Sequence, residues 1–181
     1  VTAALGELRT LGSEWALEHH RGISLYKLGL SETRQSSWRN LLDEARIRIR
    51  EGSEGEADLV AVAYADCRRA ACPEPSSLLD YAIDRGFSHF LVDTFDKTTG
   101  GLSEFFEWGE LAALCERARQ GGLCFVAAGS LGAGQLGAAA EAGVDVIAVR
   151  GAATVGIRTA AINRQAVSEL AAGIRSALSP G

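Results

Sequence analysis

The sequence predicts an α/β protein of the (β/α)8 TIM-like barrel class. Short apolar stretches recur along its 181 residues, and segments with helical periodicity alternate with them. Several of the apolar stretches end in a residue that can carry chemistry, as barrel strands do at the mouth where substrate binds. Each pair of strand and helix occupies about 25 to 35 residues, which suits a right-handed parallel crossover.

Six runs are predicted as strands because they are short and rich in β-branched or aromatic residues, which is typical of buried parallel strands. They are Val1–Leu5, Ile23–Leu28, Leu59–Tyr64, Phe90–Val92, Cys124–Ala127 and Val144–Val149. Six other segments are predicted as helices from their apolar periodicity. They are Glu14–His20, Trp38–Arg50, Ser76–Arg85, Glu107–Gln120, Gly134–Glu141 and Ala161–Leu178.

The number of units is lower than a closed barrel requires. Such a barrel has eight strands and typically about 250 residues, whereas six βα units are visible here. We therefore expect residues 1–181 to form a single barrel domain that lacks the first two βα units. Six parallel strands leave two open edges, which another segment or a second copy in a homo-oligomer would cover. A doubly wound open sheet is the structural alternative.

Composition restricts the classes of partner. The net charge of −5 and the pI near 5.3 argue against nucleic acid, whose phosphates need a concentrated basic face. No apolar run reaches the roughly 18 residues of a spanning helix, so we expect no membrane partner and a cytoplasmic location. The four cysteines form no CxxC pair, so we expect reduced thiols and no structural metal site.

Three residues at or near predicted strand ends are candidates for catalysis. Lys27 lies inside an apolar strand, where an ammonium has no structural use and is costly to bury without a partner. Asp93 follows another strand and Lys97 lies four residues later, so a carboxylate and an amine can face one mouth. A lysine beside an apolar wall can act as a base or form a Schiff base. The alternatives are an outward-pointing Lys27 and an ordinary surface ion pair between Asp93 and Lys97.

Residues after three of the strands are candidates for substrate binding. Tyr64 and Asp66 follow the third strand, and Asp66 equally suits a helix cap. Small residues after the last two strands expose backbone amides, which in many barrels bind a substrate phosphate together with a cation. They are Gly129, Ser130, Gly151 and Ala152, with Arg150 as the cation. The alternative is that these glycines only permit tight turns. We therefore expect a phosphorylated small molecule as substrate.

Five short segments, taken together, resemble one known family. They read YKLGL at Tyr26–Leu30, AYAD at Ala63–Asp66, VDTFDK at Val92–Lys97, AAGS at Ala127–Ser130 and VRGAA at Val149–Ala153. Their order is similar to that in the (5-formylfuran-3-yl)methyl phosphate synthases over nearly the whole chain. The resemblance implies a (β/α)8 barrel of methanofuran biosynthesis. It also implies a reaction in which two molecules of glyceraldehyde 3-phosphate become 4-(hydroxymethyl)-2-furancarboxaldehyde phosphate, with no metal or organic cofactor.

The resemblance also suggests roles for individual residues. By it, Lys27 matches a proton acceptor, and Asp93 with Lys97 match a polar pair of the active site. The Schiff-base lysine of the family lies on the second barrel strand, and no residue of this sequence matches it. We interpret this as omission of the first two βα units. Two alternatives stay open, namely another phosphate-binding Schiff-base aldolase or isomerase and a non-catalytic relative that binds triose phosphate.

Overall fold

The computed structural model describes residues 1–12, 15–33, 38–98, 100–155 and 159–178. Of residues 176–178 it describes only the backbone. Six strands form one sheet in the order of the sequence, and each neighbouring pair is parallel. They are β1 (Thr2–Glu7), β2 (Leu25–Gly29), β3 (Asp58–Tyr64), β4 (His89–Asp93), β5 (Cys124–Ala127) and β6 (Val146–Ile147). Sequential parallel order is that of a (β/α)8 barrel, so the predicted class is confirmed. A doubly wound sheet would reverse its order at a switch point.

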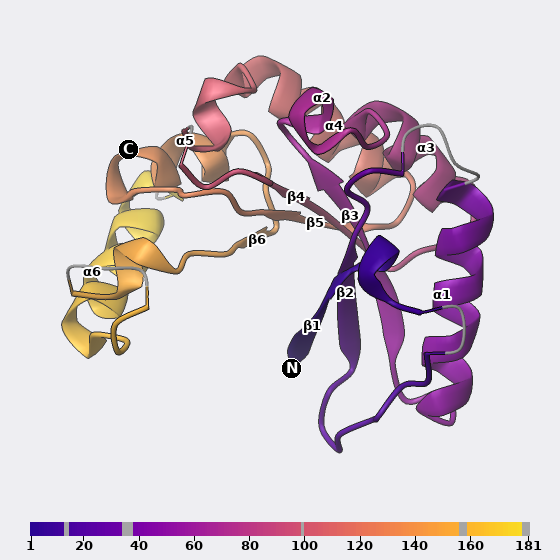
Figure 1. Cartoon of the computed structure of the whole chain (residues 1–181). Helices are drawn as coiled ribbons and strands as arrows, with labels where there is room; N and C mark the ends of the chain where they lie inside the picture. The colour runs from indigo at the N-terminus through magenta and orange to yellow at the C-terminus, as the bar shows by residue number, and fades with distance from the viewer. Residues whose placement is uncertain (13–14, 34–37, 99, 156–158, 179–181) are drawn as a thin grey trace.

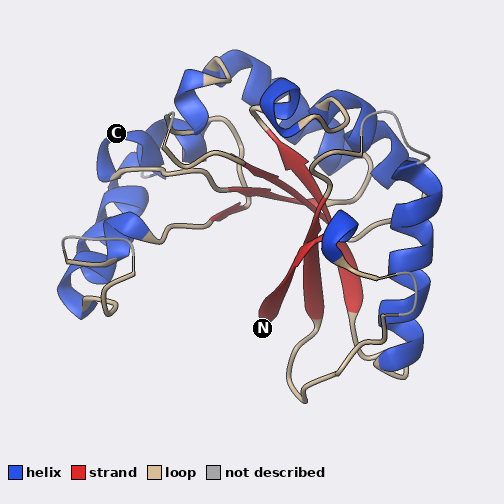
Figure 2. Cartoon of the chain, in the orientation of Figure 1, coloured by secondary structure: helices blue, strands red, loops and turns tan. Residues whose placement is uncertain are grey.

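The helices lie along the convex side of the curved sheet (Figure 1). They are α1 (Trp38–Gly52), α2 (Cys67–Ala70), α3 (Pro75–Asp84), α4 (Trp108–Gln120), α5 (Leu136–Glu141) and α6 (Arg164–Leu178). Short 3-10 turns occur in the connections at η1 (Leu8–Thr10), η2 (Leu102–Glu104), η3 (Ala133–Gln135) and η4 (Gly151–Ala153). Figure 2 shows that the helices leave the concave side of the sheet open, and no pairing joins β1 to β6 within the described ranges.

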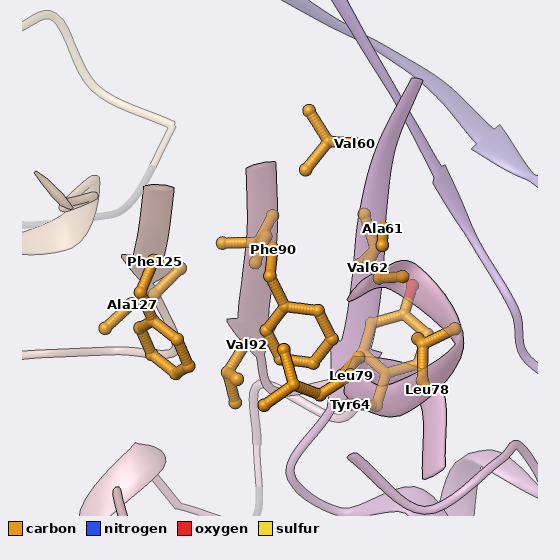
Figure 3. Packing of buried hydrophobic residues seen from close by; sticks show 14 of the residues in the cluster. Val60, Ala61, Val62, Tyr64, Leu78, Leu79, Phe90, Val92, Phe125 and Ala127 are labelled. Carbon is orange, nitrogen blue, oxygen red and sulfur yellow. The ribbon is translucent and has the colours of Figure 1, made fainter. Parts of the chain in front are cut away.

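The hydrophobic core lies between the sheet and these helices. Tyr26, Phe90 and Phe125 are among its largest fully buried side chains. The rings of Phe90 and Phe125 lie 5.7 Å apart on neighbouring strands, in the cluster that also contains Leu78 and Leu79 of α3 (Figure 3). Because successive strand residues point to opposite faces, the residues between these core positions point to the concave face.

The helix predicted over Glu14–His20 is wrong where the structure describes it. Residues 15–20 form an irregular connection, and Glu14 lies outside the described residues. The Trp15 carbonyl accepts a hydrogen bond from the Arg48 guanidinium at 3.0 Å, and the His20 amide donates to the hydroxyl of Tyr26 at 3.4 Å. These tertiary contacts take the place of helical hydrogen bonds, which are marginal in so short a segment.

Two predicted elements are shorter than expected. The strand predicted over Val144–Val149 is confined to β6 at the end of the sheet. The helix predicted from Ala161 begins at Arg164, because the side-chain oxygen of Asn163 accepts the amide of Ala166 at 2.8 Å and caps the first turn. The other helices agree within a few residues, although the four-residue helix α2 was not expected.

The structure also bears on the cysteines and on membrane insertion. All four cysteines lie in described segments, and none of them forms a disulfide there. Burial raises the pKa of the Cys115 thiol to about 12, which suits a small core residue rather than a nucleophile. None of the helices in the described ranges combines the length and hydropathy that a membrane span needs.

Candidate active site

A cavity of about 790 Å³ lies on the concave face of the sheet. Inward-facing residues from all six strands form its wall, and the loops after β4, β5 and β6 form its rim. Most of the predicted site residues line it. They are Lys27, Asp93, Lys97, Gly129, Ser130, Arg150, Gly151 and Ala152. Residues that are widely separated in the sequence are thus brought to one place.

Lys27 lies in the middle of β2 with its side chain on the cavity wall. Its register partners are Ala4 of β1 and Val60 of β3, which offer no counter-charge. Among the described residues, no carboxylate forms an ion pair or a hydrogen bond with the Lys27 ammonium. Because Lys27 lines the cavity, the outward-pointing alternative is excluded.

Asp93 and Lys97 form a pair at the rim of the cavity. Lys97 Nζ donates a hydrogen bond to Asp93 Oδ1 and another to Thr94 Oγ1, the latter at 3.2 Å. Both charged side chains are 28% exposed, which places the pair between bulk solvent and the apolar wall. The contact keeps an amine and a carboxylate where a proton can pass between them.

The two lysines of the chain both lie at this cavity, whereas its other basic side chains are arginines or histidines. Of the 18 arginine and lysine residues in the chain, Lys27 and Lys97 are the only lysines. An arginine stays protonated, whereas a lysine amine can lose its proton and act as a base or a nucleophile. Both amines line one cavity. The scarcity of lysine is therefore a signal in the composition that points to these two positions.

A hydrogen-bonded bridge connects β1 to β3 across the end of β2. The Tyr64 hydroxyl donates to Glu7 Oε1 at 2.5 Å, and the Ser31 amide donates to Glu7 Oε2 at 2.9 Å. A Cβ atom on Gly29 would lie 2.2 Å from both the Tyr64 oxygen and Glu7 Oε1, so only glycine fits beneath the bridge. Burial and the nearby Glu7 carboxylate raise the pKa of Tyr64, which keeps its hydroxyl protonated as the donor.

This bridge changes the interpretation of two residues. Tyr64 does not line the cavity, because its hydroxyl is engaged with Glu7 beside it. Glu7 lies two residues beyond the first strand that the sequence predicts, which ends at Leu5. The structure extends β1 to Glu7. A carboxylate two residues beyond an apolar run is the signal in the sequence for Glu7, although the run does not indicate its partner.

Asp66 lies behind the rim and is only 5% exposed. Its Oδ1 accepts the amide of Phe95 at 2.7 Å, and its Oδ2 accepts the amide of Asp96 at 2.9 Å. The side chain does not line the cavity, and it makes no capping hydrogen bond to α2. The carboxylate instead holds the backbone of the turn that joins Asp93 to Lys97.

The loops after β5 and β6 complete the rim. Gly129 and Ser130 both have left-handed backbone, with φ of +107° and +53°, and for Ser130 this conformation is strained. Arg150 is exposed at the rim and precedes η4. A hydroxyl, a guanidinium and small backbone-exposing residues thus share the cavity with the two amines. In the described ranges, no group of three or more His, Cys, Asp and Glu side chains is arranged to hold a metal ion.

Comparison with known proteins identifies the family. The sequence model of the 4-HFC-P synthase family matches residues 1–171. The chain belongs to this family. A (5-formylfuran-3-yl)methyl phosphate synthase of Methanothermobacter thermautotrophicus is 34% identical over 152 residues, which are 82% of this chain and 64% of the relative. One of Methanobrevibacter smithii is 29% identical over 154 residues, 84% of this chain and 65% of the relative. The chain spans less than two thirds of the length of either relative.

The segments Ala63–Asp66, Val92–Lys97, Ala127–Ser130 and Val149–Ala153 lie at or after the carboxyl ends of β3, β4, β5 and β6, whereas Tyr26–Leu30 runs along β2. A solved structure supports the fold alone. GMP reductase from Trypanosoma brucei, in complex with guanosine 5'-triphosphate, is 17% identical with a TM-score of 0.59, and the match covers 87% of this chain and 36% of the reductase.

Proposed function

We propose that this protein condenses two molecules of glyceraldehyde 3-phosphate to 4-(hydroxymethyl)-2-furancarboxaldehyde phosphate in the biosynthesis of a methanofuran-type cofactor. The observation that carries the proposal is that both lysines of the chain share one cavity with a carboxylate. Lysine amines form Schiff bases with carbonyl substrates, and positioned amines and carboxylates transfer protons. The names of the relatives support this product. Because phosphate and water leave, the reaction is that of a carbon–oxygen lyase.

Lys27 is the proton acceptor in this proposal. Its side chain projects from the middle of β2 into the cavity, and within the described residues no carboxylate holds it. Asp93 and Lys97 supply the acid and base for dehydration, since a hydrogen bond already joins their side chains. The roles are thus divided between an amine on the wall and an amine–carboxylate pair at the rim.

The loops after β5 and β6 hold a substrate phosphate in this proposal. Ser130 supplies a hydroxyl and Arg150 a guanidinium that matches phosphate geometry. Gly129, Gly151 and Ala152 allow the backbone to approach an anion closely because they lack bulky side chains. All five line the cavity that contains the two amines. The phosphate would then place the carbonyl end of the triose among the reactive side chains.

Trapping with borohydride tests the proposal. The protein, expressed from its complete reading frame, is incubated with glyceraldehyde 3-phosphate and borohydride, and peptide mapping identifies the lysine that carries an adduct. A parallel incubation without borohydride is scanned for the absorbance of the furan aldehyde. We expect both a trapped lysine and the furan. The Lys27→Arg variant serves as a control, because it keeps the positive charge but cannot act as a base near neutral pH.

The other outcomes contradict the proposal in different ways. An adduct without the furan indicates another Schiff-base aldolase or isomerase of phosphorylated sugars. Neither an adduct nor a furan, with binding of glyceraldehyde 3-phosphate in calorimetry, indicates a relative that binds triose phosphate without turnover.

A further inference from the structure

The turn that carries the reactive pair has its amide groups bound to carboxylates. The amide of Thr94 donates to Asp93 Oδ1 at 2.8 Å. The amides of Phe95 and Asp96 donate to the two oxygens of Asp66, at 2.7 and 2.9 Å. Hydrogen bonds to a buried carboxylate are stronger than those between neutral groups. The backbone between the two reactive residues is thus fixed from the end of the neighbouring strand.

A second contact from the same segment supports this arrangement. Arg69 of α2 forms an ion pair with Asp96 at 2.8 Å. Asp96 Oδ1 in turn accepts the amide of Thr98 at 2.9 Å and its hydroxyl at 2.7 Å. Arg69 is 49% exposed, so its ion pair contributes little by itself. The buried Asp66 is the stronger of the two restraints.

The turn is also confined on its other side. A Cβ atom on Gly129 would lie 3.2 Å from the amide nitrogen of Thr94, and the Gly129 carbonyl accepts the amide of Leu102 at 2.8 Å. The loop after β5 therefore packs directly against the loop after β4. Gly129 on one side and Asp66 on the other therefore restrict the position of the turn.

We propose that Asp66 is a positioning residue that sets the geometry of the Asp93–Lys97 pair. Lys97 follows directly after Asp96, whose amide Asp66 binds, and in this turn Lys97 Nζ donates a hydrogen bond to Asp93. The two oxygens of Asp66 are occupied by this task behind the cavity, so Asp66 acts through the turn and not on the substrate. The role rests on the proposed function and extends it to a residue outside the cavity.

Kinetics of the Asp66→Asn variant test the role. An amide of the same shape keeps one acceptor but directs an N–H group at a backbone N–H group. We expect kcat to fall by about tenfold or more, since a displacement of about 1 Å can cost a hundredfold, with KM for glyceraldehyde 3-phosphate changed by less than about threefold. The matched control is Asp58→Asn at the other end of the same strand, for which we expect a lower melting temperature and an unchanged kcat.

Two kinetic results would overturn the role. A folded Asp66→Asn variant with kcat within about twofold of the native value shows that the turn does not depend on Asp66. A rise in KM with unchanged kcat shows that Asp66 holds the substrate instead.

A measurement on Lys97 separates this proposal from the proposed function. Reductive methylation with formaldehyde and borohydride is followed residue by residue, and Lys27 on the cavity wall serves as the internal standard. We expect Lys97 to react about threefold faster or more in Asp66→Asn, because it is released from Asp93, and Lys27 to react at its native rate. If Lys97 is methylated at the same rate in Asp66→Asn and in the native protein, the positioning role is overturned, even if the protein shows no synthase activity. If Asp66→Asn does not fold, the same comparison is made with Asp66→Glu, which keeps the charge but displaces the two acceptor oxygens from the amides of Phe95 and Asp96. Equal rates of Lys97 methylation in this variant and in the native protein again overturn the role.

Discussion

The two ends of β3 use an aspartate in different ways, Asp58 partly exposed and Asp66 buried. Asp58, the first residue of the strand, accepts two hydrogen bonds of 2.8 Å from the Arg46 guanidinium of α1, and Arg50 donates two more at 2.8 and 3.2 Å. Arg46 also donates to the carbonyls of Arg85 and Gly86 after α3, at 2.7 and 2.8 Å. Asp66 lies just beyond the other end. Among the described residues, its carboxylate accepts hydrogen bonds only from the loop amides of Phe95 and Asp96.

The difference follows from what each aspartate holds. Asp58 attaches helices to the sheet, so its loss should loosen the whole domain. Asp66 fixes one turn beside the cavity, so its loss should affect reactivity. This division is that of barrel enzymes, in which the amino end of the strands contributes stability and the carboxyl end contributes chemistry.

The largest expected effects lie in the cavity, at Lys27 in the middle of β2 and at Asp93, the last residue of β4. Lys27→Ala and Asp93→Ala should each lower turnover by at least about a hundredfold, as expected for groups that transfer protons, with little change in melting temperature. Steady-state rates and thermal unfolding of both variants provide the measurement. Turnover near the native rate in either variant would remove that residue from the proposed mechanism. It would also contradict the view that the carboxyl ends of the strands contribute the chemistry.

Gly29→Ala should show that the carboxyl end also contributes to stability. The added methyl group would lie 2.2 Å from both partners of the bridge between Glu7 and Tyr64. We expect a loss of about 2 to 3 kcal/mol in the free energy of unfolding by urea, because a buried hydrogen-bonded network must shift. The control is Gly109→Ala in α4, where no atom lies within 4 Å of the new methyl group. An equal loss in both variants would contradict the steric explanation.

Asp58→Asn should lower stability in a manner that depends on pH. Burial by itself would raise the pKa of Asp58, but the hydrogen bonds from Arg46 and Arg50 outweigh it and lower this pKa from 3.8 to about 2. The carboxylate therefore stabilises the fold fully above about pH 4, and this contribution disappears as the pH falls through about 2. We expect a loss of about 1 to 2 kcal/mol at pH 7, after allowance for partial exposure.

Urea unfolding of the native protein and of Asp58→Asn at pH 7 and at pH 2.5 provides the test of this dependence. The difference between the two proteins should be smaller at the lower pH. A difference that is the same at both pH values would show that the charge of Asp58 is not the source of its effect.

The smallest expected effect belongs to Tyr64→Phe. The variant loses the hydrogen bond to Glu7 but keeps the ring, whose centre lies 5.4 Å from that of Phe95. We expect a loss of about 1 kcal/mol in unfolding free energy and a change in KM of less than about threefold. A large rise in KM would show that the hydroxyl binds the substrate, as the sequence alone suggests.

The strands could be predicted from the sequence because buried parallel strands are apolar over their whole length. The segment around Trp15 could not, because its helical pattern is overridden by contacts with Arg48 and Tyr26, which come from other elements. Sequence periodicity reports the preference of a segment, whereas these hydrogen bonds depend on the finished arrangement of the sheet and α1.

The site could be predicted where a charged residue interrupts or ends an apolar strand, as Lys27 does within β2 and Asp93 does at the end of β4. The functions of Asp66 and Glu7 could not be predicted in the same way. Asp66 binds the amides of Phe95 and Asp96, and every residue except proline carries such an amide, so no pattern in the sequence indicates the partner. Glu7 in turn depends on a tyrosine two strands away.

The bridge between Glu7 and Tyr64 joins three strands into one cooperative unit at their carboxyl ends. β1 pairs with β2, and Glu7 reaches past β2 to the Tyr64 hydroxyl of β3 at 2.5 Å. Local opening of β1 at this end must therefore break a contact with β3 as well as its own ladder of hydrogen bonds. We expect the amides of the three strands near the bridge to exchange with solvent together.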